Sequence, residues 1–148
     1  MKPGQNRFAA VFITFAVLTL SACSDMSMKK DASLYDRLGG KPAITAVVDD
    51  FVANVAADKR INGRFANANI DRLKQMLVAQ ICAGTGGPCS YTGRDMQSAH
   101  KGMNISDAEF GALVEDLVTT LDKFKVPTKE KQDLLAVLGP MKPAIVGQ

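Results

Sequence analysis

Apolar residues recur every three or four positions through most of this 148-residue sequence, and that spacing restricts the fold more than any other feature. A period near 3.6 residues places apolar side chains on one face of an α-helix, whereas a half-buried strand needs strict alternation. No stretch of useful length alternates in this way, and no internal repeat is visible. The sequence therefore predicts an all-α domain.

The first half of this domain is predicted to hold three helices. Ser33 begins a short helix, which the Gly39-Gly40 pair ends. Pro42 suits the first turn of the next helix, because no backbone N–H is needed there. After a polar, glycine-containing segment, a third helix runs to Gly84. The second and third helices each carry one apolar face, formed by Ile44, Val47, Val48, Phe51, Val52 and Val55 and by Ile70, Leu73, Met76, Leu77 and Ile81.

The second half carries the most clearly marked helix. Ser106 and Glu109 form a capping box at its start, in which each side chain can bond the other residue's backbone N–H. Its apolar stripe consists of Phe110, Leu113, Val114, Leu117, Leu121 and Phe124. Pro127-Thr128 begins a last helix that Gly139-Pro140 ends. A short, glycine-bounded helix around His100 precedes this pair of helices.

The first 22 residues have the layout of a signal peptide. A basic start precedes an apolar run, residues 8–20, which is too short to span a bilayer comfortably. The run closes with Leu20-Ser21-Ala22-Cys23, which resembles the lipobox of bacterial lipoproteins. This resemblance implies cleavage before Cys23, lipid on its thiol as a membrane anchor and, with Ser24 next, sorting to the outer membrane as a periplasm-facing lipoprotein. The alternative is an ordinary secretory signal with an incidental cysteine.

Removing residues 1–22 takes away Lys2 and Arg7 but no acidic residue, so 16 of the 18 basic residues remain against 15 acidic ones. A nearly neutral domain gives no electrostatic reason to expect nucleic-acid binding. Residues 23–32 are polar and lack periodicity, which is typical of a tether between the lipid and a domain. The remaining residues, 33–148, suffice for one domain with one core.

Cys82 and Cys89 remain once Cys23 carries lipid, and they flank a glycine-rich turn. An oxidising compartment permits a disulfide between them. The sequence leaves its formation open, because spacing along the chain does not give the Cα geometry that a disulfide requires. A disulfide here would close a short loop and stabilise the fold by about 2–3 kcal/mol.

His100 is the only histidine, so metal ligation through imidazole or proton transfer near pH 7 must use this residue. Met96 lies one turn earlier and shares its helix face, and Met103 follows closely. An isolated histidine on such a face is commonly a surface or hydrogen-bonded residue, and ligation is the alternative. Two long amphipathic helices flank the helix of His100, and their apolar faces are wide enough to enclose a flat ligand.

From Ser33 to Met141 the sequence resembles the group I truncated haemoglobins of the bacterial-like globin family. The similarity begins with SLYDRLGG, continues through AITAVVDDFVANVAADKRINGRF, and is tightest in GGPCSYTGRDMQSAHKGMNIS and the EFGALVEDLV that follows. The family's glycine pairs correspond to Gly39-Gly40 and Gly86-Gly87. The resemblance implies the short globin fold, in which two helices pack over two around haem b.

By this resemblance His100 is the proximal histidine, which binds the haem iron through one ring nitrogen. Its other nitrogen is expected to donate to a backbone carbonyl one turn earlier, which fixes the ring orientation and the ligand strength. Phe65 corresponds to the phenylalanine that stacks on the haem, and Phe110 to an aromatic residue on the proximal side. Met96 is expected to contact the haem as well.

The distal side departs from the family pattern. Leu73, Met76 and Leu77 fall on the distal helix, but Val52 replaces the usual tyrosine, and Leu77 replaces a glutamine often found with it. A distal donor makes a charge-assisted bond to bound oxygen worth about 1.5–3 kcal/mol, so its loss predicts faster oxygen dissociation. Gln75 and Gln80 remain candidate donors, but Gln75 is expected to point away from the apolar stripe and to be solvated.

Three side chains on the distal helix, those of Met76, Arg72 and Lys74, have two interpretations each. Met76 either fills the core or reaches the iron as a sixth ligand, which would give the His/Met coordination of electron-transfer cytochromes. Arg72 and Lys74 either pair with the haem propionates or are solvated surface charges.

The function implied by the resemblance is reversible binding of oxygen, nitric oxide or carbon monoxide at haem iron in an apolar pocket. Enzymatic activity is left open, because nitric oxide dioxygenase or peroxidase chemistry would need a redox partner protein that this chain does not encode. The alternatives are a haem carrier, a six-coordinate electron-transfer protein, and a haem-free globin fold that serves as an interaction module.

Overall fold

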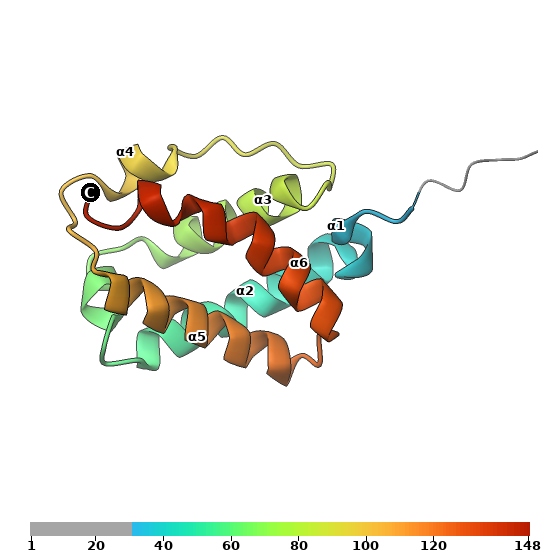
Figure 1. Ribbon diagram of the computed structural model, residues 1–148, viewed down its shortest axis with the longest axis horizontal. Coiled ribbons are helices and arrows are strands. Elements are labelled where there is room, and N and C mark those ends of the chain that lie inside the picture. The colour runs from blue at the N-terminus through green and yellow to red at the C-terminus, as the bar shows by residue number, and fades with distance from the viewer. Residues whose placement is uncertain (1–30) are drawn as a thin grey trace, which may run out of the picture. The chain divides into compact units, whose positions relative to one another are not determined.

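In the computed structural model, which describes residues 31–148, every regular element is a helix (Figure 1). The elements are α1 (Leu34–Arg37), α2 (Gly40–Ala57), the 3₁₀ helix η1 (Asn62–Phe65), α3 (Ile70–Gly84), α4 (Met96–His100), α5 (Asp107–Lys123), α6 (Thr128–Leu138) and the 3₁₀ helix η2 (Gly139–Ala144). An isolated parallel bridge between Ile105 and Val146 is the only β-type pairing in this part of the chain. The prediction of an all-α domain is confirmed.

The predicted start and stop signals coincide with the ends of these helices. Ser33 caps α1, and Ser106 and Glu109 form the predicted capping box of α5. Gly39, whose φ of 90° is left-handed, separates α1 from α2. The helix α6 ends at Leu138 as expected, but the chain then continues as η2, which the sequence pattern does not predict.

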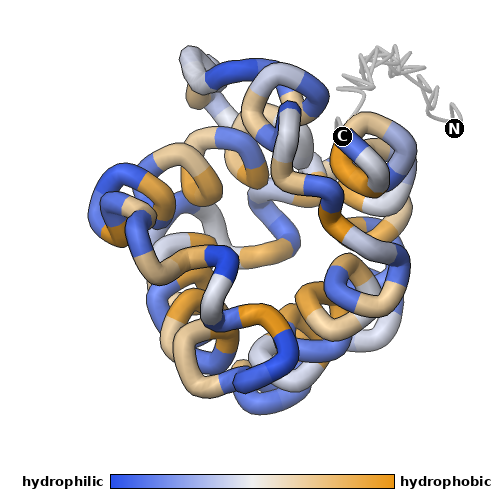
Figure 2. The backbone as a smooth tube through the Cα atoms, turned by 90° about the vertical axis from the view of Figure 1, so that its left-hand side faces the viewer, coloured by the Kyte–Doolittle hydropathy of each residue, from blue (hydrophilic) through white to orange (hydrophobic). Residues whose placement is uncertain are grey.

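The helix α2 packs against both α3 and α5. Val48 of α2 and Leu121 of α5 are almost completely buried. The buried Thr120 hydroxyl accepts a hydrogen bond of 2.8 Å from the Asn54 amide, so one polar contact also joins α2 to α5 inside the core. Figure 2 shows hydrophobic and hydrophilic residues interleaved along the helical turns, as burial of one face of each helix requires.

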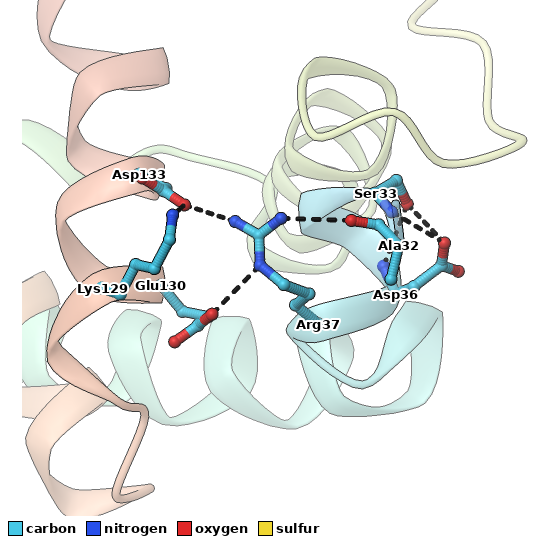
Figure 3. A network of polar contacts seen from close by, with 7 residues as sticks. All are labelled: Ala32, Ser33, Asp36, Arg37, Lys129, Glu130 and Asp133. Atoms are coloured by element: carbon cyan, nitrogen blue, oxygen red, sulfur yellow. Dashed lines mark hydrogen bonds and ion pairs between the residues drawn. The ribbon is translucent and has the colours of Figure 1, made fainter. Parts of the chain in front are cut away.

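Arg37 joins α1 to α6 (Figure 3). Its guanidinium pairs with Glu130 at 3.0 Å and with Asp133, which also pairs with Lys129 at 2.7 Å. Another of its nitrogens donates to the Ala32 carbonyl oxygen at 3.2 Å. Because these groups are partly exposed, the network orients α1 more than it stabilises the fold.

Cys82 and Cys89 form the disulfide that the sequence left open, with their Cα atoms 5.7 Å apart. Cys82, near the end of α3, is completely buried. The Gly87 N–H donates to the Cys82 carbonyl oxygen at 2.8 Å, and a Cβ at position 87 would lie only 2.7 Å from the Cys82 sulfur. Position 87 therefore requires glycine, which lets the chain turn back against the disulfide.

The predicted signal peptide, residues 1–22, and the predicted lipidation site Cys23 lie outside the described residues. The predicted tether, residues 23–32, also lies outside them except for Asp31 and Ala32, which have no regular secondary structure. None of the helices in the described domain combines the length and hydrophobicity that a membrane span requires.

Candidate functional site

His100 is the last residue of the five-residue helix α4, whose N-terminus is capped by Asp95. The His100 Nδ1 atom lies 2.7 Å from the carbonyl oxygen of Met96, one turn earlier. Because a carbonyl oxygen only accepts, Nδ1 is the donor, and the neutral imidazole with this tautomer has its lone pair on Nε2. The expected hydrogen bond is confirmed, and it leaves Nε2 as a nitrogen able to bind a metal.

The His100 side chain lines an apolar cavity of about 70 Å³ where four other parts of the fold meet. Phe65 comes from η1, Phe110 from α5, Ile105 from the loop after α4, and Ile145 from the segment after η2. The lining consists of Ile61, Arg64, Phe65, His100, Met103, Ile105, Glu109, Phe110, Leu113 and Ile145. The structure thus brings together three residues predicted from the sequence, His100, Phe65 and Phe110.

Arg64 and Glu109 form a charged corner of this cavity. Arg64 donates to both carboxylate oxygens of Glu109, at 2.6 and 3.1 Å, and to the Met103 carbonyl oxygen at 2.9 Å. The Arg64 guanidinium, followed by the backbone and hydroxyl donors of Ser106, lowers the pKa of Glu109 to about 2. One arginine therefore ties η1 to the start of α5 and to the loop after His100.

The residues predicted for the distal side do not line this cavity. Leu73, Met76 and Leu77 are half-buried on α3, and Leu77 packs against the hydrophobic core. Val52 is 6 % exposed and belongs to the core itself. These four side chains carry no N–H or O–H group, so none of them can act as a hydrogen-bond donor.

Gln80, the candidate donor considered from the sequence, contacts sulfur atoms instead. Its amide nitrogen lies 3.4 Å from the Met96 sulfur and 3.3 Å from the Met141 sulfur. These contacts use both N–H groups of the amide. Gln80 thereby joins α3 to α4 and η2, and Met96 contributes its side chain to this junction and its backbone carbonyl to His100.

Arg72 and Lys74, which were predicted as propionate partners or surface charges, both lie on α3. Arg72 is exposed, while Lys74 pairs with Asp49 of α2 at 2.9 Å. Lys74 therefore has a protein partner, and propionate pairing stays a prediction for both residues.

Several lining residues are absent from the sequence-based prediction. Ile61 and Arg64 lie in a polar segment without helical periodicity, and Ile145 follows the glycine-proline signal that ends the last predicted helix. An isoleucine within a polar or irregular segment is a weak sign of burial, but no pattern marks Arg64. Residues 31–148 contain no group of three or more His, Cys or acidic side chains that could hold a metal, so His100 is the candidate ligand by itself.

Comparison with known proteins adds to this geometry. The model of the bacterial-like globin family matches residues 33–146. The group 1 truncated haemoglobin of Mycolicibacterium paratuberculosis is 37% identical over 114 residues, which are 77% of this chain and 84% of that protein. The group 1 truncated haemoglobin of Tetrahymena pyriformis is 36% identical over 99 residues, which are 67% of this chain and 82% of that protein.

Solved structures show the same fold. The Fe(III) form of the Tetrahymena pyriformis truncated haemoglobin gives a TM-score of 0.76 at 31% identity and covers 79% of this chain and 100% of that chain. The 2/2 haemoglobin of Synechococcus sp. with covalently attached haem gives 0.74 at 30% identity and covers 78% and 98%. The predicted truncated globin fold, two helices over two, is confirmed, and haem b is the standard cofactor of such globins. The chain belongs to the bacterial-like globin family, and its relatives are group 1 truncated haemoglobins.

Proposed function

We propose that this protein binds haem b through His100 and reversibly binds a diatomic gas at the haem iron. The observation that carries the proposal is the hydrogen bond from His100 Nδ1 to the Met96 carbonyl, beside an apolar cavity. The residues present fit the cofactor, because Phe65 and Phe110 offer apolar faces for a flat ring and Nε2 offers a neutral nitrogen for iron. When bound, haem supplies an iron with a further coordination position, where a gas can bind.

The chain's own groups then set the properties of the site. The Met96 carbonyl keeps the proton on Nδ1, fixes the plane of the imidazole and makes Nε2 a stronger ligand. The apolar lining limits the access of water, which also influences the redox potential of a bound cofactor. Gln80 contacts the Met96 sulfur and so helps to position Met96, whose backbone carbonyl orients His100.

By the family resemblance, Val52 and Leu77 stand where a tyrosine and a glutamine usually donate to bound oxygen, and neither carries a donor. The missing bond corresponds to roughly ten- to hundredfold weaker oxygen binding. Nitric oxide and carbon monoxide are less polarised when bound and should be less affected. A fast-exchanging gas-binding protein fits these residues better than an oxygen store. Enzymatic turnover of nitric oxide or peroxide would additionally need a redox partner protein.

The deciding experiment is the optical spectrum of the domain, Ser24–Gln148, reconstituted with haem in ferric and reduced forms, with and without carbon monoxide. A five-coordinate ferrous spectrum that converts on adding the gas supports the proposal. Sharp six-coordinate ferrous bands that resist carbon monoxide would instead place the half-buried Met76 on the iron and favour electron transfer. Failure to bind haem leaves an interaction module, and rapid haem transfer to other proteins favours a carrier.

We also infer that the mature protein is a periplasm-facing lipoprotein anchored through Cys23, in the outer membrane. The lipobox-like Leu20-Ser21-Ala22-Cys23 supports this inference, and the Cys82–Cys89 disulfide suits an oxidising compartment. Metabolic labelling with a fatty acid tests it. The wild type should incorporate the label and need detergent for extraction from membranes. The Cys23→Ala variant should carry no label and be released without detergent, and an unlabelled wild type would refute the inference.

A further inference from the structure

The chain after η2, residues 145–148, lies against the loop that follows His100, and we call it the C-terminal strap. Figure 1 shows this end of the chain beside α4. The contacts are a hydrogen bond from Gly147 N–H to the Ile105 carbonyl oxygen at 2.9 Å, one from Asn104 N–H to the Gln148 carbonyl oxygen at 2.6 Å, and the parallel bridge between Ile105 and Val146. The strap therefore pairs with the loop as a strand would.

The loop, residues 101–105, depends on such outside partners. Gly102 and Asn104 both have left-handed backbone conformations, with φ of 79° and 49°. Asparagine is among the few non-glycine residues that adopt this conformation readily, so the loop turns sharply here and its position depends on its contacts with other segments. Arg64 supplies a second outside contact through the Met103 carbonyl oxygen. The position of the loop is thus set by the strap and by η1.

The strap also reaches the candidate site and α4 directly. The Ile145 side chain lines the same cavity as His100. The Gln148 side-chain oxygen accepts a hydrogen bond of 3.4 Å from Gln97 of α4, and η2, which leads into the strap, packs against α4. The helix that carries His100 is only five residues long, so it has little stability of its own.

We propose that the C-terminal strap holds His100 in its ligand position and that opening of the strap sets the rate at which the protein loses haem. This inference rests on the proposed function. Short segments held by a few hydrogen bonds open more readily than core helices do. Each opening frees the loop after α4, removes Ile145 from the cavity wall and lets the imidazole turn away from the iron.

The Gly147→Pro variant tests this proposal in the full mature domain. Proline lacks the N–H that donates to Ile105 and cannot adopt the φ of 73° found at position 147. Haem transfer to an excess of apomyoglobin should become about tenfold faster, the scale on which supports of metal ligands act. Resonance Raman spectra of the ferrous protein should show a shifted or broadened iron–histidine band. In the haem-free protein, hydrogen exchange should accelerate at Asn104 and its neighbours.

The comparison variant is Gln148→Ala, which keeps both backbone hydrogen bonds of the strap but loses the side-chain contact with Gln97, so haem release should accelerate less than in Gly147→Pro. Unchanged transfer and exchange in Gly147→Pro would overturn the proposal. So would faster exchange throughout α2, because the effect would then be a general loss of stability. A wild type that takes up no haem would overturn the proposed function together with this inference. If the wild-type iron is ligated by histidine but Gly147→Pro loses haem no faster, only this inference is overturned.

Discussion

The cavity beside His100 and the α3 face that the sequence predicts as the distal side are held by different interactions. On the α3 side, Leu77 packs against the core that contains Val52, and a disulfide with one fully buried cysteine fixes the end of the helix. On the α4 side, the five-residue helix bearing His100 and the loop after it are held by hydrogen bonds, including one from Arg64 to the Met103 carbonyl oxygen, and by the strap. Close-packed cores move little, whereas exposed hydrogen bonds open locally. The difference predicts a rigid distal wall facing an adjustable proximal ligand.

The largest effect should come from removing the proximal ligand itself. His100→Ala leaves no histidine in the chain to bind the iron. Loss of a residue that only supports a metal ligand lowers affinity by about 10- to 100-fold, so loss of the ligand itself should lower haem affinity by more than about 100-fold. Haem titration followed by the optical spectrum measures this loss. Added imidazole should restore a histidine-like spectrum by occupying the vacated space. A variant whose haem spectrum equals that of the wild type would show that His100 is not the ligand.

The disulfide tests the rigidity of the α3 side. Replacing both Cys82 and Cys89 by alanine should lower the free energy of unfolding by about 2–3 kcal/mol, measured by urea denaturation, because the unfolded chain gains freedom. Reduced wild-type protein is the control, since it keeps the cysteine side chains. If core packing also fixes α3, haem release should change less than in Gly147→Pro. A larger change would mean that the disulfide, and not packing, holds the distal wall.

A polar group placed on the apolar wall should sharpen the comparison further. In Leu77→Gln the new amide N–H can donate to bound oxygen, which should slow oxygen dissociation about tenfold, measured by stopped flow. Carbon monoxide dissociation should change much less, because the bound gas is less polarised. Gln75→Leu, on the exposed side of the same helix, is a matched control that should leave both rates unchanged. Equal slowing of both gases would indicate a steric effect instead.

The long helices and the hydrogen bond within α4 were the easier parts to predict from the sequence. Regular apolar spacing and capping residues such as Ser106 mark the long helices, because burial of one face repeats with the helical period. The hydrogen bond of His100 to a carbonyl one turn back also follows from helix geometry. Arg64 and Ile145 could not be predicted, since their positions depend on loop and 3₁₀ conformations and on pairings across 39 or more residues of chain. Arg64 and Ile145, which reach the proximal side from distant parts of the chain, are therefore not marked by local patterns, whereas Glu109 is marked by its capping box.

The smallest effect concerns the ion pair between Arg64 and Glu109 beside the His100 cavity, which acid should weaken by protonating Glu109. Glu109 has a pKa of about 2 in the folded protein against an ordinary value of 4.5, first because of Arg64 and then because of the Ser106 donors. A carboxyl group with a lowered pKa stabilises the fold fully above pH 4.5 and loses that contribution as the pH falls towards 2. Glu109→Gln removes this contribution at every pH. The melting temperatures of wild type and variant should therefore differ at pH 6 and converge as the pH falls from about 4.5 towards 2. Because the pair also holds the loop after His100, haem release should be modestly faster in the variant at pH 6. A constant difference in melting temperature across this pH range would show that the charge of Glu109 does not stabilise the fold.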